Sequence, residues 1–322
     1  MNEMSIPGSI ESRSVCEACG TGLVEKLPSV VDPQTRERFA IVGCPRCGLG
    51  KTLPQPEALS PYYGPAYHGG RHGFTAWYCV QRRLRLLRHA AGRGAGRRLL
   101  DVGCGDGAFL VSARRDGWEV AGTEMNPSLA RAAGIKVWTQ FDEAAALAPF
   151  ACVTAWHSLE HLRSPREVIR QAVGLLEPGG VLLVAVPNAE GLQARMYGSK
   201  WFHLDVPRHL YHFGPRSLTM LLEGAGLEVV RRVHLEVEID MFGWTQSALN
   251  CISEEPNVFF NHLTGRPSKA GAALKWSHFA AGTLITAMAG PLTAIGALAG
   301  RGAVLVMTAR KPRSNHGVAR AA

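Results

Sequence analysis

One short stretch constrains the fold of this chain more than any other: Leu99–Leu110, which runs Leu-Leu-Asp-Val-Gly-Cys-Gly-Asp-Gly-Ala-Phe-Leu. Its apolar residues up to Val102 are typical of the end of a buried strand, and the apolar residues after Gly107 open a helix. Glycines at alternate positions join the two, and glycine lets the backbone come close to a ligand because it has no Cβ. A strand, a glycine turn and a helix N-terminus in this order predict a ligand-binding crossover in an α/β fold.

The spacing of Gly103, Gly105 and Gly107 argues against a dinucleotide ligand. Dinucleotide-binding folds use the spacing G-x-G-x-x-G, which this turn does not have. Asp101, directly before the turn, would repel a pyrophosphate and suits a cationic ligand with an amino group. An NAD-dependent dehydrogenase is therefore disfavoured.

The stretch resembles motif I of the class I S-adenosylmethionine (SAM)-dependent methyltransferases. Two later segments add to the resemblance: Trp118–Glu124, which ends on an acidic residue, and Leu176–Asn188, which carries an L-x-P-G-G turn before an apolar run. The resemblance implies that the glycine turn contacts the methionine and sugar of SAM, that Glu124 binds the ribose hydroxyls, and that the segment around Phe141 approaches adenine. The SAM-binding residues that it implies are Asp101, Gly103, Gly105, Gly107, Glu124, Phe141 and His157.

Two cysteine pairs precede this core, Cys16/Cys19 and Cys44/Cys47, each in a C-x-x-C-G knuckle. Four thiolates complete a tetrahedral zinc site with no open position, so we expect a structural zinc ion in a zinc-ribbon-like module. A redox-active pair is the alternative. The other cysteines are scattered and are expected to be ordinary thiols: Cys79, Cys104, Cys152 and Cys251.

Strand and helix patterns alternate from Arg98 to about Val230, which predicts a parallel sheet with helices on both faces. The resemblance adds an antiparallel seventh strand. We expect strands at 98–102, 118–123, 135–138, 151–156, 180–186, 227–235 and 303–309.

Histidines and carboxylates gather after the expected fourth and fifth strands, in 156–161 and 201–213. The catalytic candidates are His157, Glu160, His161 and His212. In one interpretation, His161 or His212 removes a proton from a substrate hydroxyl, since the ordinary pKa of histidine lies near neutrality.

In a second interpretation these four residues bind a divalent metal. The pattern is similar to the E-x-x-E-H motif and the later His-Phe of some ubiquinone-pathway O-methyltransferases and small-RNA 2′-O-methyltransferases, but His157 replaces the first glutamate. Three imidazoles and one carboxylate would favour zinc, manganese or iron over magnesium. A purely structural cluster is the third interpretation.

About sixty residues separate the last two expected strands, and among them Phe279–Gly300 has no charged residue. Its length would suffice to span a bilayer, but a single crossing would place two pairing strands on opposite sides. Pro291 is expected to divide the segment into two short helices. These helices either contact a membrane surface through 279–300 or form a helical cap or dimer interface.

The predicted fold class is α/β: a doubly wound, Rossmann-like, seven-stranded and mostly parallel sheet with an N-terminal zinc ribbon and a C-terminal hydrophobic helical insert. We expect the following segments: zinc-ribbon-like module 1–52, linker and lid helix 53–97, SAM-binding core 98–240, helical insert 241–302, and last strand with basic tail 303–322.

The predicted function is SAM-dependent methyl transfer to a small molecule, on a hydroxyl of a metabolite, sugar or lipid-linked precursor. Sugar C-methylation, nucleic-acid 2′-O-methylation and SAM binding without turnover are the alternatives. The net charge of +9 suits anionic partners, but no basic groove studded with aromatic residues marks a nucleic-acid site. No apolar run follows the first residues, so we expect a cytoplasmic location with or without membrane contact. The sequence leaves the oligomeric state open.

Overall fold

The computed structural model describes residues 15–63 and 74–313. The main sheet has the order β10-β11-β8-β7-β4-β5-β6. Strands β4 to β8 run parallel, and β11 is antiparallel to both of its neighbours, β8 and β10. The bounds are β4 (Arg98–Val102), β5 (Glu119–Thr123), β6 (Lys136–Trp138), β7 (Phe150–Trp156), β8 (Leu176–Pro187), β10 (Glu228–Val233) and β11 (Val304–Arg310). The predicted fold class is confirmed.

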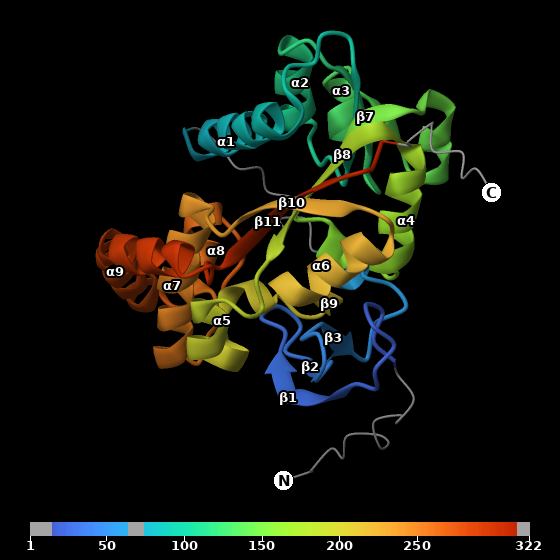
Figure 1. Cartoon of the computed structure of the whole chain (residues 1–322). Coiled ribbons are helices and arrows are strands. Elements are labelled where there is room, and N and C mark those ends of the chain that lie inside the picture. The colour runs from blue at the N-terminus through green and yellow to red at the C-terminus, as the bar shows by residue number, and fades with distance from the viewer. Residues whose placement is uncertain (1–14, 64–73, 314–322) are drawn as a thin grey trace, which may run out of the picture.

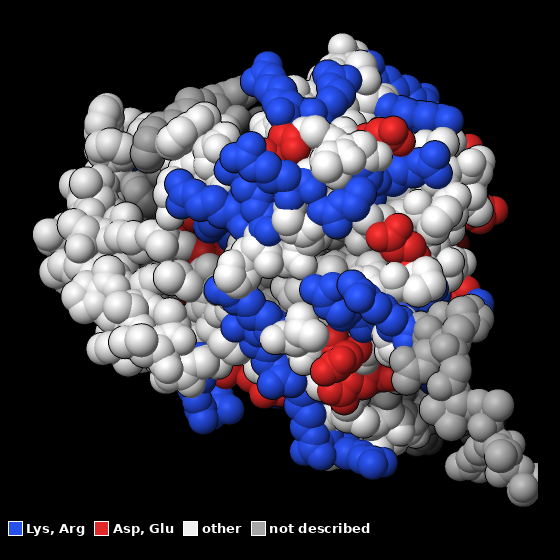
Figure 2. All heavy atoms as spheres, turned by 45° about the horizontal axis from the view of Figure 1, so that its top comes forward, with Lys and Arg blue, Asp and Glu red and all other residues white. Residues whose placement is uncertain are grey.

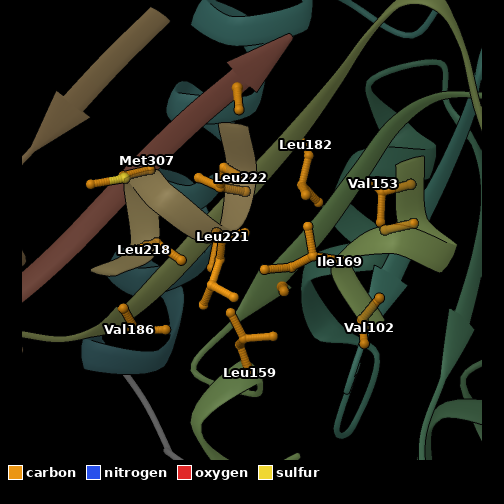
Figure 3. Packing of buried hydrophobic residues seen from close by; sticks show 14 of the residues in the cluster. Val102, Val153, Leu159, Ile169, Leu182, Val186, Leu218, Leu221, Leu222 and Met307 are labelled. Atoms are coloured by element: carbon orange, nitrogen blue, oxygen red, sulfur yellow. The ribbon is translucent and has the colours of Figure 1, made fainter. Parts of the chain in front are cut away.

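Helices cover both faces of this sheet because side chains of each strand alternate between two cores. On β8, Leu182 and Val184 belong to the cluster under α4 (Pro165–Leu175) and α6 (Pro215–Gly224). Leu183 and its alternate neighbours face the opposite cluster, under α1 (Phe74–Ala91), α2 (Ala108–Arg115) and α3 (Ser128–Ala132). Figure 3 shows side chains of α6 packed against the first cluster.

A second, smaller sheet forms the N-terminal module, drawn at the bottom of Figure 1. Its antiparallel strands are β1 (Val24–Val31), β2 (Arg38–Gly43) and β3 (Gly50–Leu53). The fourth strand, β9 (Tyr211–His212), lies much later in the sequence and pairs with β3. The module is therefore joined to the core through a shared sheet.

The insert between β10 and β11 is helical and projects to one side of the sheet (Figure 1). It comprises α7 (Val237–Ile252), α8 (Val258–Thr264) and α9 (Ala272–Leu298). Two expectations were wrong here. The sixth strand stops at Val233, and α9 continues through Pro291, because a proline removes only one hydrogen bond of a helix that packing on α7 supports.

Short elements complete the described chain: α5 (Leu192–Tyr197) and the 3₁₀ turns η1 (Ser60–Tyr62), η2 (Asp142–Leu147), η3 (Leu159–His161), η4 (Gly198–Lys200) and η5 (Phe202–Leu204). The ends of the expected first and last segments, and part of the expected linker, lie outside the described residues.

Candidate functional site

The glycine turn between β4 and α2 depends on glycine at two points of close contact. Gly103 has a φ of +72°, and a Cβ there would lie 2.7 Å from the Cβ of Ser158. Gly107 has a φ of +77°, and its Cβ would lie 3.2 Å from the Cβ of Ala130. Gly105, with a φ of +57°, has no described heavy atom within 4 Å of the position of a Cβ, so its side faces open space.

Glu124 follows β5 and faces this turn. Its Oε2 accepts a hydrogen bond of 2.9 Å from the backbone N–H of Gly105, and its Oε1 accepts one of 3.2 Å from the N–H of Asn126. Phe141, at the start of η2, packs half-buried against the core on the α4 and α6 side. The structure thus places the Glu124 carboxylate directly at the glycine turn.

Asp101 lies at the end of β4 and is 2% exposed. Its Oδ1 accepts a 2.6 Å hydrogen bond from the hydroxyl of Thr154 on β7. Burial raises the pKa of Asp101 to about 7, although the Thr154 hydrogen bond and the charge of Arg83 oppose the shift. A cation bound beside the turn would favour the ionised form of this carboxyl.

His157 follows β7 with a φ of +53°, an uncommon backbone conformation for a residue other than glycine. Its Nε2 lies 2.9 Å from Glu236 Oε2, and its Nδ1 lies 3.7 Å from Glu160 Oε1. Burial alone would lower the pKa of His157, but the two carboxylates raise it above its ordinary value. Glu236 also pairs with Arg82 of α1 at 2.8 Å. The sequence did not point to Glu236, because both of its partners lie far away in the chain.

Glu160, His161 and His209 form a close polar group near the end of β7. Their candidate ligand atoms all lie within 4.8 Å of one another. Glu160 is 1% exposed, and neither of its carboxylate oxygens has a hydrogen-bond partner among the described residues. Burial alone would raise the pKa of Glu160, but His157 and the other nearby imidazoles lower it, so the carboxylate is charged.

Backbone carbonyls fix the two imidazoles of this group. Nδ1 of His161 lies 2.9 Å from the carbonyl oxygen of Arg208, and Nδ1 of His209 lies 2.9 Å from that of His203. A carbonyl only accepts, so these contacts assign the proton to Nδ1 and leave Nε2 basic in both rings. Burial is the main reason that the pKa of His209 falls to about 4, with the charge of His161 adding to it.

The structure does not bring His212 into this group. His212 lies on β9, and its Nε2 is 2.9 Å from the hydroxyl of Thr52 on β3. Strand pairing with β3 turns the ring toward the N-terminal module, so the imidazole beside Glu160 and His161 is that of His209. Sequence spacing alone gave no means of choosing between the two histidines.

The four cysteines of the N-terminal module converge. The Sγ atoms of Cys16 and Cys47 are 3.4 Å apart, as are those of Cys19 and Cys44, and no disulfide joins any cysteines that the structure describes. Sulfur atoms at such distances fit the corners of a tetrahedron around one zinc ion. The structure thus supports the predicted zinc ribbon.

A cavity of about 1050 Å³ lies beside the histidines. Its described wall comes from the β1–β2 turn, the loop around 202–209, the helices α1, α7 and α8, and the segment 265–269 after α8. His209 and Asp205 line it together with the aromatic rings of Phe202, Phe242 and Phe260. Such a volume, lined by aromatic rings and by polar and charged side chains, suits a small organic molecule with polar groups.

The chain is similar in sequence to known methyltransferases. A family model described as "Methyltransferase domain" matches residues 76–232. Two curated relatives are each named ubiquinone biosynthesis O-methyltransferase. The one from Xanthomonas axonopodis pv. citri is 30% identical over 153 residues, which cover 42% of this chain and 64% of the relative. The one from Ralstonia nicotianae is 29% identical over 160 residues, covering 44% and 67%.

The chain therefore spans just under two thirds of the first of these relatives. Among solved structures, a SAM-dependent methyltransferase from Archaeoglobus fulgidus aligns with a TM-score of 0.46 and 20% identity, covering 73% of this chain and 94% of that one.

Proposed function

We propose that residues 76–232, which match a family model described as "Methyltransferase domain", form a class I SAM-dependent methyltransferase domain, and that the whole chain transfers the methyl group of SAM to a hydroxyl of a small molecule. The observation that carries the proposal is the position of Glu160, His161 and His209. Ser158, two residues before Glu160, touches the glycine turn, while His209 lines the cavity. A basic group between a cofactor seat and an acceptor cavity is what methyl transfer to oxygen requires.

SAM would bind along the carboxyl ends of β4 and β5, with its methionine and sugar against Gly103, Gly105 and Gly107. Glu124 would exchange its hydrogen bond from Gly105 for the ribose hydroxyls. Asp101 would supply negative charge beside the cationic ligand, and Phe141 would lie near adenine. His157, fixed by Glu236, would close the site from the side of β7.

The acceptor would enter the cavity with its hydroxyl toward His161. Nε2 of His161 takes the hydroxyl proton as the oxygen forms its bond to the methyl carbon. SAM would supply the methyl carbon, and its sulfur would keep the electron pair of the broken carbon–sulfur bond. Glu160 stabilises the imidazolium that results. Placement in line with the methyl group and removal of one proton are all that the reaction asks of the protein.

A divalent metal is a second candidate for this position. Glu160 supplies a charged carboxylate, and His161 and His209 supply Nε2 atoms whose rings are held by carbonyls, which is the usual support of metal-binding histidines. Two imidazoles and one carboxylate fit zinc, manganese or iron better than magnesium. Bound there, such an ion would polarise the acceptor hydroxyl.

The relatives' names support oxygen as the acceptor atom, and the partly aromatic cavity supports a small molecule as the acceptor. We place the reaction in the cytoplasm and keep the five expected segments, 1–52, 53–97, 98–240, 241–302 and 303–322, as a proposed division of the chain. Carbon methylation and nucleic-acid methylation have no feature of the cavity in their favour.

The test is His161→Ala. We expect the variant to bind SAM as the unsubstituted protein does, and to lose turnover by about 10²–10⁴-fold. Titration calorimetry measures SAM binding, and transfer of an isotopically labelled methyl group into a metabolite extract, read by mass spectrometry, measures turnover. His89→Ala, at an exposed position of α1, is the matched control.

Retained turnover in His161→Ala would refute the assigned base, and lost SAM affinity would refute its position on the acceptor side. Metal analysis of the purified protein separates the two candidates. One zinc ion per chain supports the base alone, and a second divalent ion that His209→Ala removes supports the metal.

A further inference from the structure

The long helix α9 has its side chains arranged in the reverse of a normal surface helix. Its buried positions carry small or polar residues: His278, Gly282, Ala289, Thr293 and Gly296. Its outer positions carry large apolar ones. Of the eighteen large apolar side chains that are exposed in the described part of the chain, eight lie on α9: Leu274, Trp276, Phe279, Leu284, Met288, Leu292, Ile295 and Leu298.

The small residues explain how α9 attaches to the rest of the insert. Gly282 lies under the ring of Phe259, where a Cβ would approach that ring to 2.7 Å, and the hydroxyls of Thr245 on α7 and Thr286 are 2.8 Å apart. The inner face of α9 is therefore covered by α7 and α8. The helix as a whole is long and apolar enough to cross a membrane by length and composition, and on its outer face Leu284 and Met288 are each 62% exposed. Contiguous exposed apolar surface of this kind marks an interaction site.

The charged side chains on α9 and directly beside it in the sequence are all cationic. The nearest carboxylate along the chain is that of Glu255, whose Oε1 accepts a hydrogen bond from the backbone N–H of Lys269. The sequence contains no aspartate or glutamate after Glu255, whereas Lys269, Lys275 and Arg301 flank or begin α9. Figure 2 shows the side of the molecule that carries the insert as a largely uncharged surface, with lysine and arginine gathered next to it. An apolar strip with a cationic border complements a surface that is apolar inside and anionic at its edge.

The chain topology determines in which orientation α9 can contact a partner surface. The insert leaves the sheet at β10 and returns at β11, and these two strands pair with each other. Both ends of the insert are thus held at one place on the folded core. A helix that is held at both ends and packed along α7 presents its side and not its end.

We propose that the outer face of α9 docks in the plane of an anionic lipid bilayer, with its large apolar side chains in one leaflet and its cations at the headgroups. Trp276, 64% exposed and next to Lys275, is suited to the boundary between the two. A second copy of the chain is a poorer occupant. A twofold contact through this face would bring the same cations together with no carboxylate of the helix to offset them.

The experiment is vesicle flotation of the full chain, which does not depend on the enzymatic activity. Vesicles of phosphatidylcholine alone are compared with an equal mixture of phosphatidylcholine and phosphatidylglycerol. The test variant carries Leu284→Gln, Met288→Gln and Ile295→Gln. The matched control carries Val24→Gln, Met196→Gln and Val230→Gln, which are exposed apolar positions outside the insert.

We expect the unsubstituted protein and the control to float with the anionic vesicles and not with neutral ones. The test variant should partition about 100-fold more weakly. Lys275→Gln with Arg301→Gln should weaken binding in a salt-dependent way. Emission of Trp276, isolated by difference from Trp276→Phe, should shift to the blue when the anionic vesicles are added.

Three results would overturn the proposal. One is an unsubstituted protein that stays in solution with anionic vesicles, and another is a test variant that floats as well as the control. The third is light scattering that finds a dimer converted to a monomer by the test variant while neither floats, which would assign the face to a second copy.

Discussion

At the scale of single residues, the glycine turn offers a matched pair of positions. Gly105 in the turn and Gly96 before β4 have positive φ values of +57° and +78°. Neither has a described heavy atom within 4 Å of where a Cβ would lie. A substitution should therefore strain the backbone by a similar amount at both. Only Gly105 faces the space proposed for SAM.

We predict that Gly105→Ala and Gly96→Ala each lower the free energy of unfolding by about 1 kcal/mol, the usual cost of a left-handed alanine. Gly105→Ala should also weaken SAM binding by at least about tenfold, because its methyl group would occupy the cofactor's space. Urea unfolding and titration calorimetry measure the two effects. Equal SAM affinity in both variants would contradict the assigned cofactor seat.

Asp101 gives a pH dependence. With its pKa raised to about 7 by burial, Asp101 is neutral below that pH when SAM is absent. Since a cation favours the carboxylate, we predict that SAM affinity rises as the pH rises through about 7 and that binding at lower pH releases a proton. Calorimetry in buffers of different ionisation enthalpy detects this proton.

The stability of the SAM-free protein should change in the opposite sense. A carboxyl whose folded pKa is raised adds stability that is complete below its ordinary pKa and is lost as the pH rises through about 7. Asp101→Asn should remove both dependences. A slope of SAM affinity that persists in that variant would show that another group is responsible.

At the scale of elements, ion pairs join α1 to the start of α7 next to His157. Arg82 of α1 pairs with Glu236 at 2.8 Å and with Glu238 at 3.3 Å, and Glu236 also holds His157. Glu236 has no exposed surface, whereas the side chain of Glu238 keeps 16%. Arg82 thus forms one fully buried ion pair, with Glu236, and one partly solvated ion pair, with Glu238. Substituting each glutamate separately compares the two pairs.

We predict that Glu236→Gln lowers the free energy of unfolding by about 3 kcal/mol, because it leaves Arg82 and His157 short of a buried partner. Glu238→Gln, the control, should cost about 1 kcal/mol or less. Chemical denaturation gives both values. Similar losses from the two variants would mean that the buried pair has no special weight.

The elements also show what local sequence can and cannot predict. The strand at 98–102 and the turn after it follow from adjacent residues, and the structure has β4 at the same bounds. The choice between His209 and His212 depends on β9 pairing with β3, some 160 residues earlier. Glu236 likewise gains its role from Arg82, on a helix far away in the chain. Such contacts leave no periodic pattern to read.

At the scale of the whole molecule, the cysteine module and the core are interlocked. The hydroxyl of Thr52 on β3 donates a 2.7 Å hydrogen bond to the carbonyl of His209. Arg208, beside it, forms an ion pair of 2.8 Å with the fully buried Asp32 of the module. The loop that carries the histidines is thus held by residues whose own positions depend on the cysteine knuckles.

We predict that Cys47→Ser abolishes zinc binding, lowers the melting temperature and stops methyl transfer, since zinc in such sites contributes about 10 kcal/mol or more to folding. SAM affinity should fall less, because the glycine turn belongs to the other sheet. Cys251→Ser, at an exposed and isolated cysteine, is the control. Metal analysis, thermal unfolding and calorimetry provide the readouts. A zinc-free variant with unchanged melting and turnover would refute the coupling.

The two residues of β9 have a wider consequence for how this architecture can vary. The zinc ribbon cannot be replaced on its own, because the last strand of its sheet, β9, belongs to the histidine loop. A ribbon taken from another protein would lack this strand as a pairing partner for β3. Changes in the ribbon and in the histidine loop should therefore accumulate together in descendant lineages. Chimaeras that exchange only the ribbon or only the histidine loop should misfold where β3 pairs with β9.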